Sequence, residues 1–321
     1  KLNVSYFLRL MLRRICESAK WKDGVVTKDD HRHEEYQYIS MIKDIINNGE
    51  LVEGRNGKTY VLCGGTMHFS LSNNTLPLLT TKKVAWKTCL RELLWFISGN
   101  TSNKVLNEQN VHIWDGNSSR EFLDSRNLFD REENDLGPIY GFQWRHFNAE
   151  YEKSDTNYRG KGIDQLNDII MQLRDPEKRN SRRLVMSAWN PCQLDEMALP
   201  PCHILCQFNV TDNNKLSCSL YQRSGDVGLG VPFNIASYAM LTHLIAHHTN
   251  MVAYEFIYYL GNAHIYDDHI EGLKSQLMRE PKRFPELTIN KKHENIEEYK
   301  VDDFKIINYE YYENIKLEMR K

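Results

Sequence analysis

The chain has 321 residues, of which 41% are hydrophobic, and its 41 Lys and Arg nearly balance its 43 Asp and Glu. A chain of this kind can bury a substantial core. Its near-neutral charge argues against nucleic acid as its main partner and against a membrane surface as a partner. No apolar run approaches the roughly 18 residues of a membrane span, and the start lacks a signal-peptide pattern. The seven cysteines are odd in number and scattered, which argues against a disulfide framework and predicts a reducing, cytoplasmic compartment.

The first 33 residues are predicted to be an N-terminal extension or linker, and residues 34–321 a catalytic domain. Within the extension, apolar residues recur at helical spacing and predict a docking helix: Phe7, Leu10, Met11 and Ile15. The chain starts at Lys1 rather than Met, and we expect it to be part of a longer protein.

Hydrophobic periodicity predicts the main elements of the larger domain. Helices are expected at residues 36–48, 84–97 and 233–248 and after Tyr266, the second of them buried and carrying one acid, Glu92. Strands are expected at residues 67–71, 184–189, 204–210, 216–223 and 255–260, and polar surface loops at 116–137 and 148–162. Because strands and helices mix without a strict βαβ alternation, the sequence predicts an α+β fold with a single large mixed sheet covered by helices.

Cys202 is the first candidate for chemistry, because two prolines hold it at the start of a predicted strand in Leu199-Pro-Pro-Cys-His203. Free cysteine has a pKa of about 8.5, so a nucleophilic role requires nearby positive charge that favours the thiolate. A buried, unreactive cysteine is the alternative. Neighbours on a strand point to opposite faces, which argues against a dyad of Cys202 with His203. The nearby cysteines also lack the paired spacing of zinc ligands, and no metal is expected.

Two groups of residues are candidates for binding a phosphate. Arg223 and Ser224 lie in Gln222-Arg-Ser-Gly-Asp226, which is predicted to be a turn after a strand, and an arginine fork with a hydroxyl suits a phosphate. Arg182 and Arg183 are adjacent, and an anion would compensate their charge. A capped surface turn and a solvated basic surface are the respective alternatives.

A glycine-rich segment, Gly228-Leu-Gly-Val-Pro-Phe-Asn234, leads into the predicted helix at 233–248. Its glycines permit close approach of a ligand, and the amide of Asn234 matches the N3 hydrogen and O4 of uracil. A helix N-cap is the alternative for Asn234. His243 and His247 lie one helical turn apart without the acid of a metalloprotease motif, and are interpreted as satisfied histidines.

In their order along the chain, these motifs resemble those of the thymidylate synthase family from about residue 34 to residue 319. The resemblance is carried by the segments Pro77–Lys82, Glu92–Phe96, Ile113–Asp115, Asp135–His146, Met197–His203, Gln222–Asp226 and Val231–Tyr238. It implies the fold of that family and its reaction, in which deoxyuridylate (dUMP) is methylated to thymidylate (dTMP). The cosubstrate 5,10-methylenetetrahydrofolate supplies the carbon and the hydride and leaves as dihydrofolate.

The resemblance also implies roles for individual residues. Cys202 adds to C6 of the dUMP ring, Glu92 and Tyr140 assist the proton transfers, Arg223 lies near Cys202, and Asn234 reads the uracil. The implied substrate ligands are Arg55, Arg182, Arg183, Gln222, Arg223, Ser224, Gly225, Asp226, Asn234, His264 and Tyr266. The implied folate ligands are Lys82, Ile113, Trp114, Asp226, Leu229, Gly230 and Phe233. In a homodimer of this family, Arg182 and Arg183 reach the partner subunit's site.

Three features depart from the family pattern. The loop Arg55-Asn-Gly-Lys-Thr59 is one residue short, so Lys58 is an alternative phosphate ligand to Arg55. The chain ends in Glu318-Met-Arg-Lys321, where the family usually has a small apolar terminus that closes over the folate. Ala85 stands at a position that is often aromatic or histidine, so one wall of the folate pocket is expected to be more open.

Residues 126–135 and 260–266 look most like those of protozoan bifunctional dihydrofolate reductase–thymidylate synthases, so a fused reductase is expected. A deoxycytidylate hydroxymethylase is the closest rival, but an aspartate would suit cytosine better than Asn234 does. A non-catalytic scaffold that binds RNA or protein is the other rival, and the intact set of chemical residues argues against it.

Overall fold

The computed structural model describes residues 21–22, 25–26, 33–54, 56–212 and 214–320. By its internal contacts the chain divides into two units, residues 1–33 and 34–321. In the first, β1 (Trp21–Lys22) pairs antiparallel with β2 (Val25–Val26). The helix predicted around residues 7–15 lies outside the described residues, so the extension and its docking helix stay a prediction.

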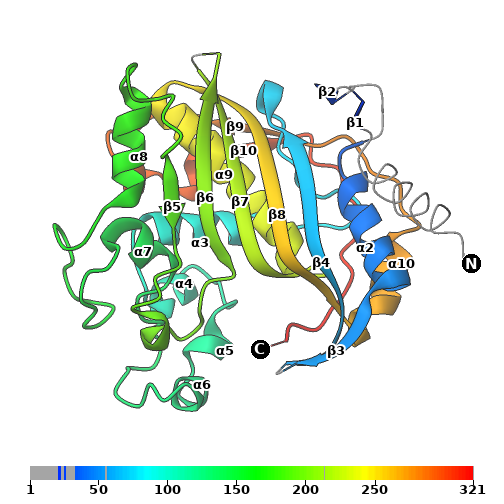
Figure 1. Cartoon of the computed structure of the whole chain (residues 1–321), viewed down its shortest axis with the longest axis horizontal. Coiled ribbons are helices and arrows are strands. Elements are labelled where there is room, and N and C mark those ends of the chain that lie inside the picture. Colours follow the sequence, from blue (N-terminus) through cyan, green and yellow to red (C-terminus); the bar gives the residue numbers. More distant parts are fainter. Residues whose placement is uncertain (1–20, 23–24, 27–32, 55, 213, 321) are drawn as a thin grey trace, which may run out of the picture. The chain divides into compact units, whose positions relative to one another are not determined.

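A six-stranded sheet is the centre of the second unit, with the strand order β3-β4-β8-β7-β6-β5 (Figure 1). All neighbouring strands are antiparallel except β7 and β8, which run parallel. The strands are β3 (Glu50–Gly54), β4 (Gly57–Ser70), β5 (Val185–Ser187), β6 (His203–Thr211), β7 (Lys215–Asp226) and β8 (Val252–Tyr266). The predicted α+β fold with one large mixed sheet is confirmed.

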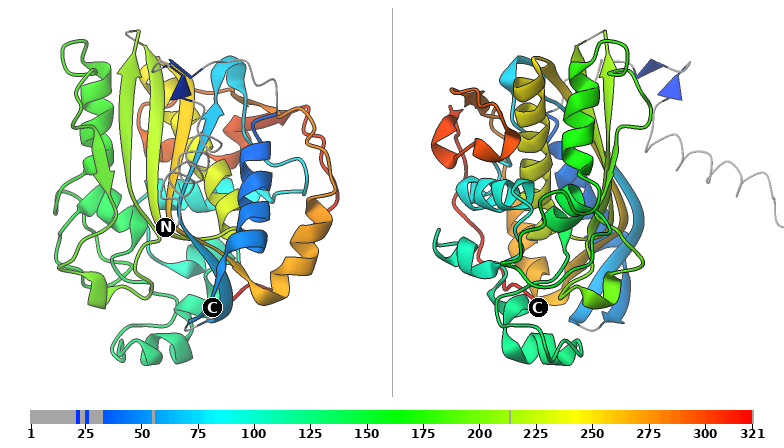
Figure 2. Two further views of the ribbon diagram at one scale, coloured as in Figure 1. Left: turned by 45° about the vertical axis from the view of Figure 1, so that its right-hand side comes forward. Right: turned by 90° about the vertical axis from the view of Figure 1, so that its left-hand side faces the viewer.

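Helix α9 (Gly230–Thr249) connects the parallel strands β7 and β8. It is buried along nearly its whole length, as expected of a helix that is apolar on all sides. It packs against β7, β8 and helix α3 (Trp86–Ile97), and both helices lie on the same side of the sheet (Figure 2). The hydrophobic core therefore fills the space between this face of the sheet and the two helices.

The remaining elements pack around this core. The other helices are α2 (Tyr36–Asn48), α4 (Asn103–Asn107), α5 (Asp115–Ser118), α6 (Arg120–Ser125), α7 (Tyr140–His146), α8 (Gln165–Arg174) and α10 (Ile270–Gln276). Strands β9 (Glu286–Ile289) and β10 (Phe304–Ile307) form an antiparallel pair. Short 3-10 turns are η1 (Ser72–Asn74), η2 (Leu194–Glu196), η3 (Asp267–His269), η4 (Ile296–Glu298) and η5 (Val301–Asp303). In the part of the chain that the structure describes, no helix has both the length and the apolarity needed to cross a bilayer.

The long helices and central strands lie where periodicity predicts them, but three local predictions are wrong. Residues 116–137 are not all loop, because α5 and α6 are helices of four and six residues, too short to show a period. The segment 148–162 is not only surface, because its two tyrosines are buried against Phe142. Residues 222–226 form no turn, because β7 continues to Asp226 in register with β8.

A buried carboxylate fixes the segment that leads into α3. Glu35 has no exposed surface, and its two carboxylate oxygens accept hydrogen bonds of 2.6–3.1 Å from the backbone and hydroxyl groups of Thr80 and Thr81. Hydrogen bonds to an ionised acceptor are stronger than neutral ones. The backbone before Lys82 is therefore held from inside the domain.

Candidate active site

Cys202 lies one residue before β6, where helix α7 meets the sheet. Its backbone N–H donates to the hydroxyl of Tyr140 at 2.8 Å, and the ring of Tyr140 stacks on that of His203 with centroids 4.2 Å apart. His203 shares a 2.8 Å hydrogen bond with the hydroxyl of Tyr238, and burial lowers its pKa to about 3. His203 is therefore not a base for Cys202, in agreement with the argument against a dyad.

Arg223 lies beside Cys202 on the neighbouring strand. Its backbone N–H donates to the Cys202 carbonyl at 2.8 Å, and its guanidinium donates to the carbonyls of Pro201 (2.8 Å) and Pro200 (2.9 Å). Burial raises the pKa of the Cys202 thiol, and the charge of Arg223 and the Tyr140 hydroxyl lower it by less. Arg223 therefore lies near Cys202 and acts towards the thiolate, as expected, but burial exceeds the effect of the guanidinium and the pKa of the thiol stays raised.

Glu92 is buried on α3, which packs against α7, the helix that carries Tyr140. Its Oε1 accepts a 2.7 Å hydrogen bond from the indole nitrogen of Trp114, whose ring lies 6.0 Å from that of Tyr140. Burial raises the pKa of Glu92 from 4.5 to about 7, and the Trp114 bond lowers it by less. The predicted buried helix that carries one acid is confirmed. Glu92 can therefore exchange a proton near neutral pH beside Tyr140.

The ends of β7 and β8 bring several predicted substrate and folate residues to one edge of the sheet. Residues 224–226 pair in parallel register with residues 262–264, so Ser224, Asp226 and His264 lie close together. Gly225 lies between them, and a Cβ there would come within 2.6 Å of the Leu260 side chain. The pairing of these strands thus gathers residues that are about 40 positions apart in the chain.

The side chain of Gln222 is engaged within the protein. Its Nε2 donates to the Ser224 carbonyl at 2.8 Å, and its Oε1 accepts a 2.6 Å hydrogen bond from the hydroxyl of Tyr258. Its fixed position supports the strand beneath Arg223 and Ser224.

The Gly228 turn is fixed from two sides. Asp226 Oδ1 accepts a 2.8 Å hydrogen bond from the Gly228 N–H, and the Nζ of buried Lys82 donates to the Gly228 carbonyl. Burial lowers the pKa of Lys82 to about 8, although the nearby Asp226 carboxylate acts to raise it. The Lys82 side chain is thus hydrogen-bonded to this turn and shielded from solvent.

Asn234 lies in the second turn of α9, whose N-cap is Leu229. The N-cap alternative is therefore wrong for Asn234. No residue in the described ranges forms a hydrogen bond with its amide, which lies near Gly230. The amide is available to a ligand.

Arg182 and Arg183 do not lie with the other predicted residues. Both are exposed and are separated by Leu184 from β5, which is the edge strand beyond β6. Arg55 lies between β3 and β4, outside the described residues. Among the other predicted ligands, Tyr266 is buried with its ring 5.5 Å from that of His264. The partly exposed ones are Ile113, Leu229, Gly230 and Phe233.

Two residues at this site were missed in the sequence. Tyr258 bonds Gln222, and His269 faces Asp226 at 3.7 Å. Tyr258 lies in the strand predicted at residues 255–260, but the sequence pattern there gives no sign of a polar contact. Asp267-Asp268-His269 has no spacing that would have singled out His269.

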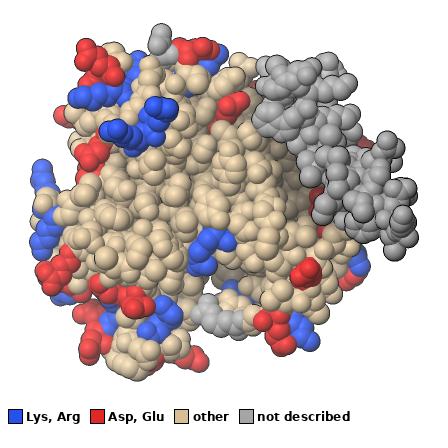
Figure 3. All heavy atoms as spheres, viewed as in Figure 1, with Lys and Arg blue, Asp and Glu red and all other residues tan. Residues whose placement is uncertain are grey.

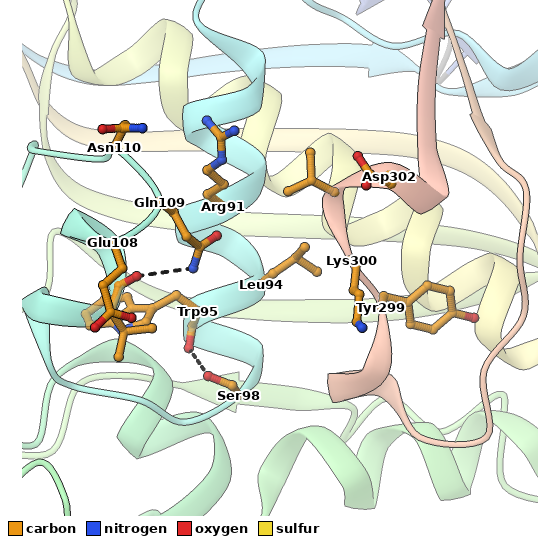
Figure 4. A pocket seen from close by; sticks show the side chains of 12 residues that line it. Arg91, Leu94, Trp95, Ser98, Glu108, Gln109, Asn110, Tyr299, Lys300 and Asp302 are labelled. Atoms are coloured by element: carbon orange, nitrogen blue, oxygen red, sulfur yellow. Dashed lines mark hydrogen bonds between the residues drawn. The ribbon is translucent and has the colours of Figure 1, made fainter.

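A groove of about 610 Å³ lies along α3, on a side of the helix that does not include Glu92 (Figure 4). It is lined by Arg91, Trp95, Glu108 and Lys300, among others, and by none of the residues predicted for the site. Arg91 points into the groove, whereas its neighbour Glu92 bonds Trp114. The groove is therefore separate from the residues around Cys202.

The chain is similar to known proteins over most of its length. It is 51% identical over 290 residues to a bifunctional dihydrofolate reductase-thymidylate synthase of Zea mays, covering 90% of this chain and 55% of that one. It is 52% identical over 309 residues to the bifunctional protein of Leishmania major, covering 96% and 59%. The chain thus spans little more than half the length of these relatives.

A shorter relative is matched from end to end. The chain is 50% identical over 293 residues to thymidylate synthase 1/2 of Encephalitozoon cuniculi, covering 90% of this chain and 98% of that one. Residues 36–321 match the family described as thymidylate synthase. The resemblance carried by the sequence motifs is confirmed: this chain belongs to the thymidylate synthase family, a family of methyltransferase enzymes.

Proposed function

We propose that the chain catalyses the reductive methylation of dUMP to dTMP, with 5,10-methylenetetrahydrofolate converted to dihydrofolate. The observation that carries the proposal is the contact of Cys202 with both Tyr140 and Arg223, next to the buried acid Glu92. A thiol, a cation and a group that titrates near neutral pH are what nucleophilic addition with proton transfer requires. Family membership supports the same reaction.

In this proposal, Cys202 is the nucleophile. Its sulfur forms a bond to C6 of the uracil ring, and the electron pair moves to C5, which attacks the methylene carbon of the folate. Glu92 and Tyr140 handle the protons, including the one lost from C5. Loss of the C5 proton breaks the bond between the methylene carbon and the folate nitrogen, which leaves an exocyclic methylene group on C5 and frees tetrahydrofolate. Tetrahydrofolate transfers a hydride to this methylene carbon to complete the methyl group and becomes dihydrofolate, while the bond between C6 and the Cys202 sulfur breaks and releases dTMP.

We propose the binding roles that the family resemblance implies. Arg223 and Ser224 hold the phosphate, together with Arg55, and Gln222 and Gly225 support this strand. Asn234 binds the uracil edge, while His264 and Tyr266 bind the deoxyribose hydroxyl. We assign the folate to Lys82, Ile113, Trp114, Asp226, Leu229, Gly230 and Phe233.

We also propose a homodimer in which Arg182 and Arg183 complete the phosphate site of the partner subunit. The face of the sheet opposite α9 carries apolar side chains that are about half exposed, including Val185 (42%), Tyr221 (41%) and Tyr259 (41%). Charged side chains gather mainly at the margins of this face (Figure 3). Apolar surfaces of this kind are typical of protein interfaces. Arg182 and Arg183 precede Val185 at its edge, so a second subunit on this face would bring its arginines close.

The full protein is proposed to carry a dihydrofolate reductase as well and to work in the cytoplasm. The names of the relatives from Zea mays and Leishmania major support the fusion. The Encephalitozoon relative is matched over nearly its whole length, so the synthase fold does not require a reductase beside it.

Substitution Cys202→Ser tests the nucleophile. With dUMP and methylenetetrahydrofolate, we expect absorbance to follow dihydrofolate formation in the wild type and a loss of roughly 1,000-fold or more in the variant. Cys192→Ser, at an exposed cysteine, is the matched control and should keep its rate within about twofold. Equal rates in wild type and Cys202→Ser would refute the assigned nucleophile. Turnover of deoxycytidylate without dihydrofolate would refute the reaction.

Substitution Glu92→Gln tests the raised pKa through stability. Folding raises the pKa of Glu92 from 4.5 to about 7, so the folded state holds its proton more tightly and wild-type stability is lost as pH rises between these values. Glutamine keeps an acceptor for Trp114 but carries no charge. We expect equal stability at about pH 4.5, and the variant to be more stable by roughly 2–3 kcal/mol at about pH 8.

Urea unfolding at both pH values measures this difference. Glu53→Gln, at an exposed position, is the control. A Glu92→Gln variant that tracks wild type at both pH values would show that burial does not hold the proton on Glu92.

Mixing two inactive variants tests the homodimer. Cys202→Ser lacks the nucleophile, and the double variant Arg182→Ala, Arg183→Ala lacks the arginines that the partner needs. After subunit exchange, half of the dimers are mixed and each has one complete site, so about a quarter of wild-type activity should return. No recovery from a mixture shown by sedimentation to be dimeric would contradict the shared site.

The mass of the polypeptide purified from its native source tests the fusion. We expect a chain long enough to include a reductase domain, together with reductase activity in the same preparation. A native polypeptide no longer than 321 residues would contradict the fusion.

A further inference from the structure

His269 is a buried side chain for which the proposed reaction gives no role. It lies in η3, directly after β8, and none of its side-chain surface is exposed. Its Nε2 is 2.7 Å from the carbonyl oxygen of Glu318 in the C-terminal tail. A carbonyl oxygen only accepts hydrogen bonds, so Nε2 must carry a proton.

The other ring nitrogen of His269 faces Asp226. Nδ1 lies 3.7 Å from Asp226 Oδ1 and has no hydrogen-bond partner among the residues that the structure describes. In a neutral ring with its proton on Nε2, Nδ1 would turn a lone pair towards a carboxylate oxygen. In the imidazolium form, Nδ1–H would instead point at that oxygen. The geometry therefore favours a His269 cation that shortens this contact into a charge-assisted hydrogen bond.

The surroundings of His269 agree with a cation. Burial acts to lower its pKa, but the Asp226 carboxylate and the Glu318 carbonyl outweigh it, so the pKa of His269 is raised. The titratable or charged groups that face it come from β7, β8, η3, the segment before α3 and the tail. The groups nearest to it are Asp226, His264, Tyr266 and Asp268. Two cations lie farther out: Lys82, which bonds the Gly228 carbonyl, and Arg320, which bonds Asp268.

His269 leaves one oxygen of Asp226 for a ligand. Oδ1 accepts from the Gly228 N–H at 2.8 Å and faces His269, whereas no described residue bonds Oδ2, and the side chain is 18% exposed. The turn is tightly closed around this arrangement, because a Cβ on Gly228 would lie 2.7 Å from His269 Nδ1 and 3.2 Å from the side chain of Leu317. The position of Asp226 is therefore set jointly by the turn, by His269 and by the tail.

We propose that His269 is a positioning residue for folate recognition: as the imidazolium it joins the Glu318 carbonyl to Asp226 Oδ1, so that Oδ2 is presented to the pterin only when the tail is in place. This inference deepens the proposed function and rests on it. The ligand class is a pterin ring with adjacent N–H donors, which suit a carboxylate acceptor. His269 touches neither substrate and acts through Asp226.

The test compares His269→Gln with His243→Gln. Both histidines are buried and donate from Nε2 to a carbonyl, but His243 lies on α9 and bonds Thr75 at 2.9 Å. Glutamine can keep a bond to a carbonyl but cannot supply the charge that faces Asp226. For His269→Gln we expect the KM for methylenetetrahydrofolate to rise about tenfold, with the KM for dUMP within about twofold of wild type. His243→Gln should leave both KM values within about twofold.

The pH dependence separates positioning from simple loss of structure. In the wild type, the KM for the folate should rise with pH as His269 loses its proton, and in His269→Gln this rise should be absent. A variant that is merely destabilised would keep the wild-type pH dependence. An unchanged folate KM in folded His269→Gln, or equal increases in both KM values, would overturn the proposal.

Nitrogen-15 NMR of the wild-type histidines gives a readout that needs neither a variant nor turnover. We expect His269, assigned by its absence from the His269→Gln spectrum or by correlation to its backbone, to have both ring nitrogens protonated at about pH 7. A neutral ring there would overturn the proposal. A wild-type protein with this doubly protonated ring but no dihydrofolate formation would instead refute the proposed reaction.

Discussion

The parallel pairing of β7 with β8 is the constraint on which the site depends. These strands run side by side to their ends, so that Asp226 pairs with His264 and Ser224 with Asn262. Parallel neighbours require a crossover, and here the buried helix α9 provides it. Because the crossover begins directly after β7, the first turns of α9, which include Asn234, lie near the same edge of the sheet. Groups proposed to bind phosphate, uracil, sugar and pterin are thus placed by one pairing.

Burial then sets the chemistry of the groups around this edge. It raises the pKa of Glu92 to about 7, lowers that of Lys82 to about 8 and raises that of Cys202 despite the nearby Arg223. Each shift favours the uncharged form, as expected when a group leaves water. The raised pKa of Glu92 suits proton exchange near neutral pH, whereas the raised pKa of Cys202 disfavours the thiolate that its proposed role as nucleophile requires.

The sequence predicted the features that depend on local patterns. It did not predict features that depend on contacts between residues far apart in the chain. The apolar residues of α3 and α9 predicted where these helices lie and that Glu92 is buried. Residues 222–226 have the composition of a turn, yet pairing with β8 keeps them extended. Asn234 has the propensity of an N-cap, but α9 begins four residues earlier. Neither outcome is visible without knowing which strands are neighbours, and the role proposed for Arg182 and Arg183 would require a second chain.

The Gly228 turn is held in place by hydrogen bonds from residues that are distant in the chain. The hydroxyl of Tyr38 on α2 donates to the Val227 carbonyl at 2.8 Å, and Lys82, fixed through the segment that Glu35 anchors, bonds the next carbonyl. These contacts come from 189 and 146 residues away in the chain. A turn held by buried groups at this many points resists local opening, since each bond would leave a buried polar group unpaired. Among the segments that hold it, the C-terminal tail has the most exposed side chains, so movement at this turn is expected to begin there.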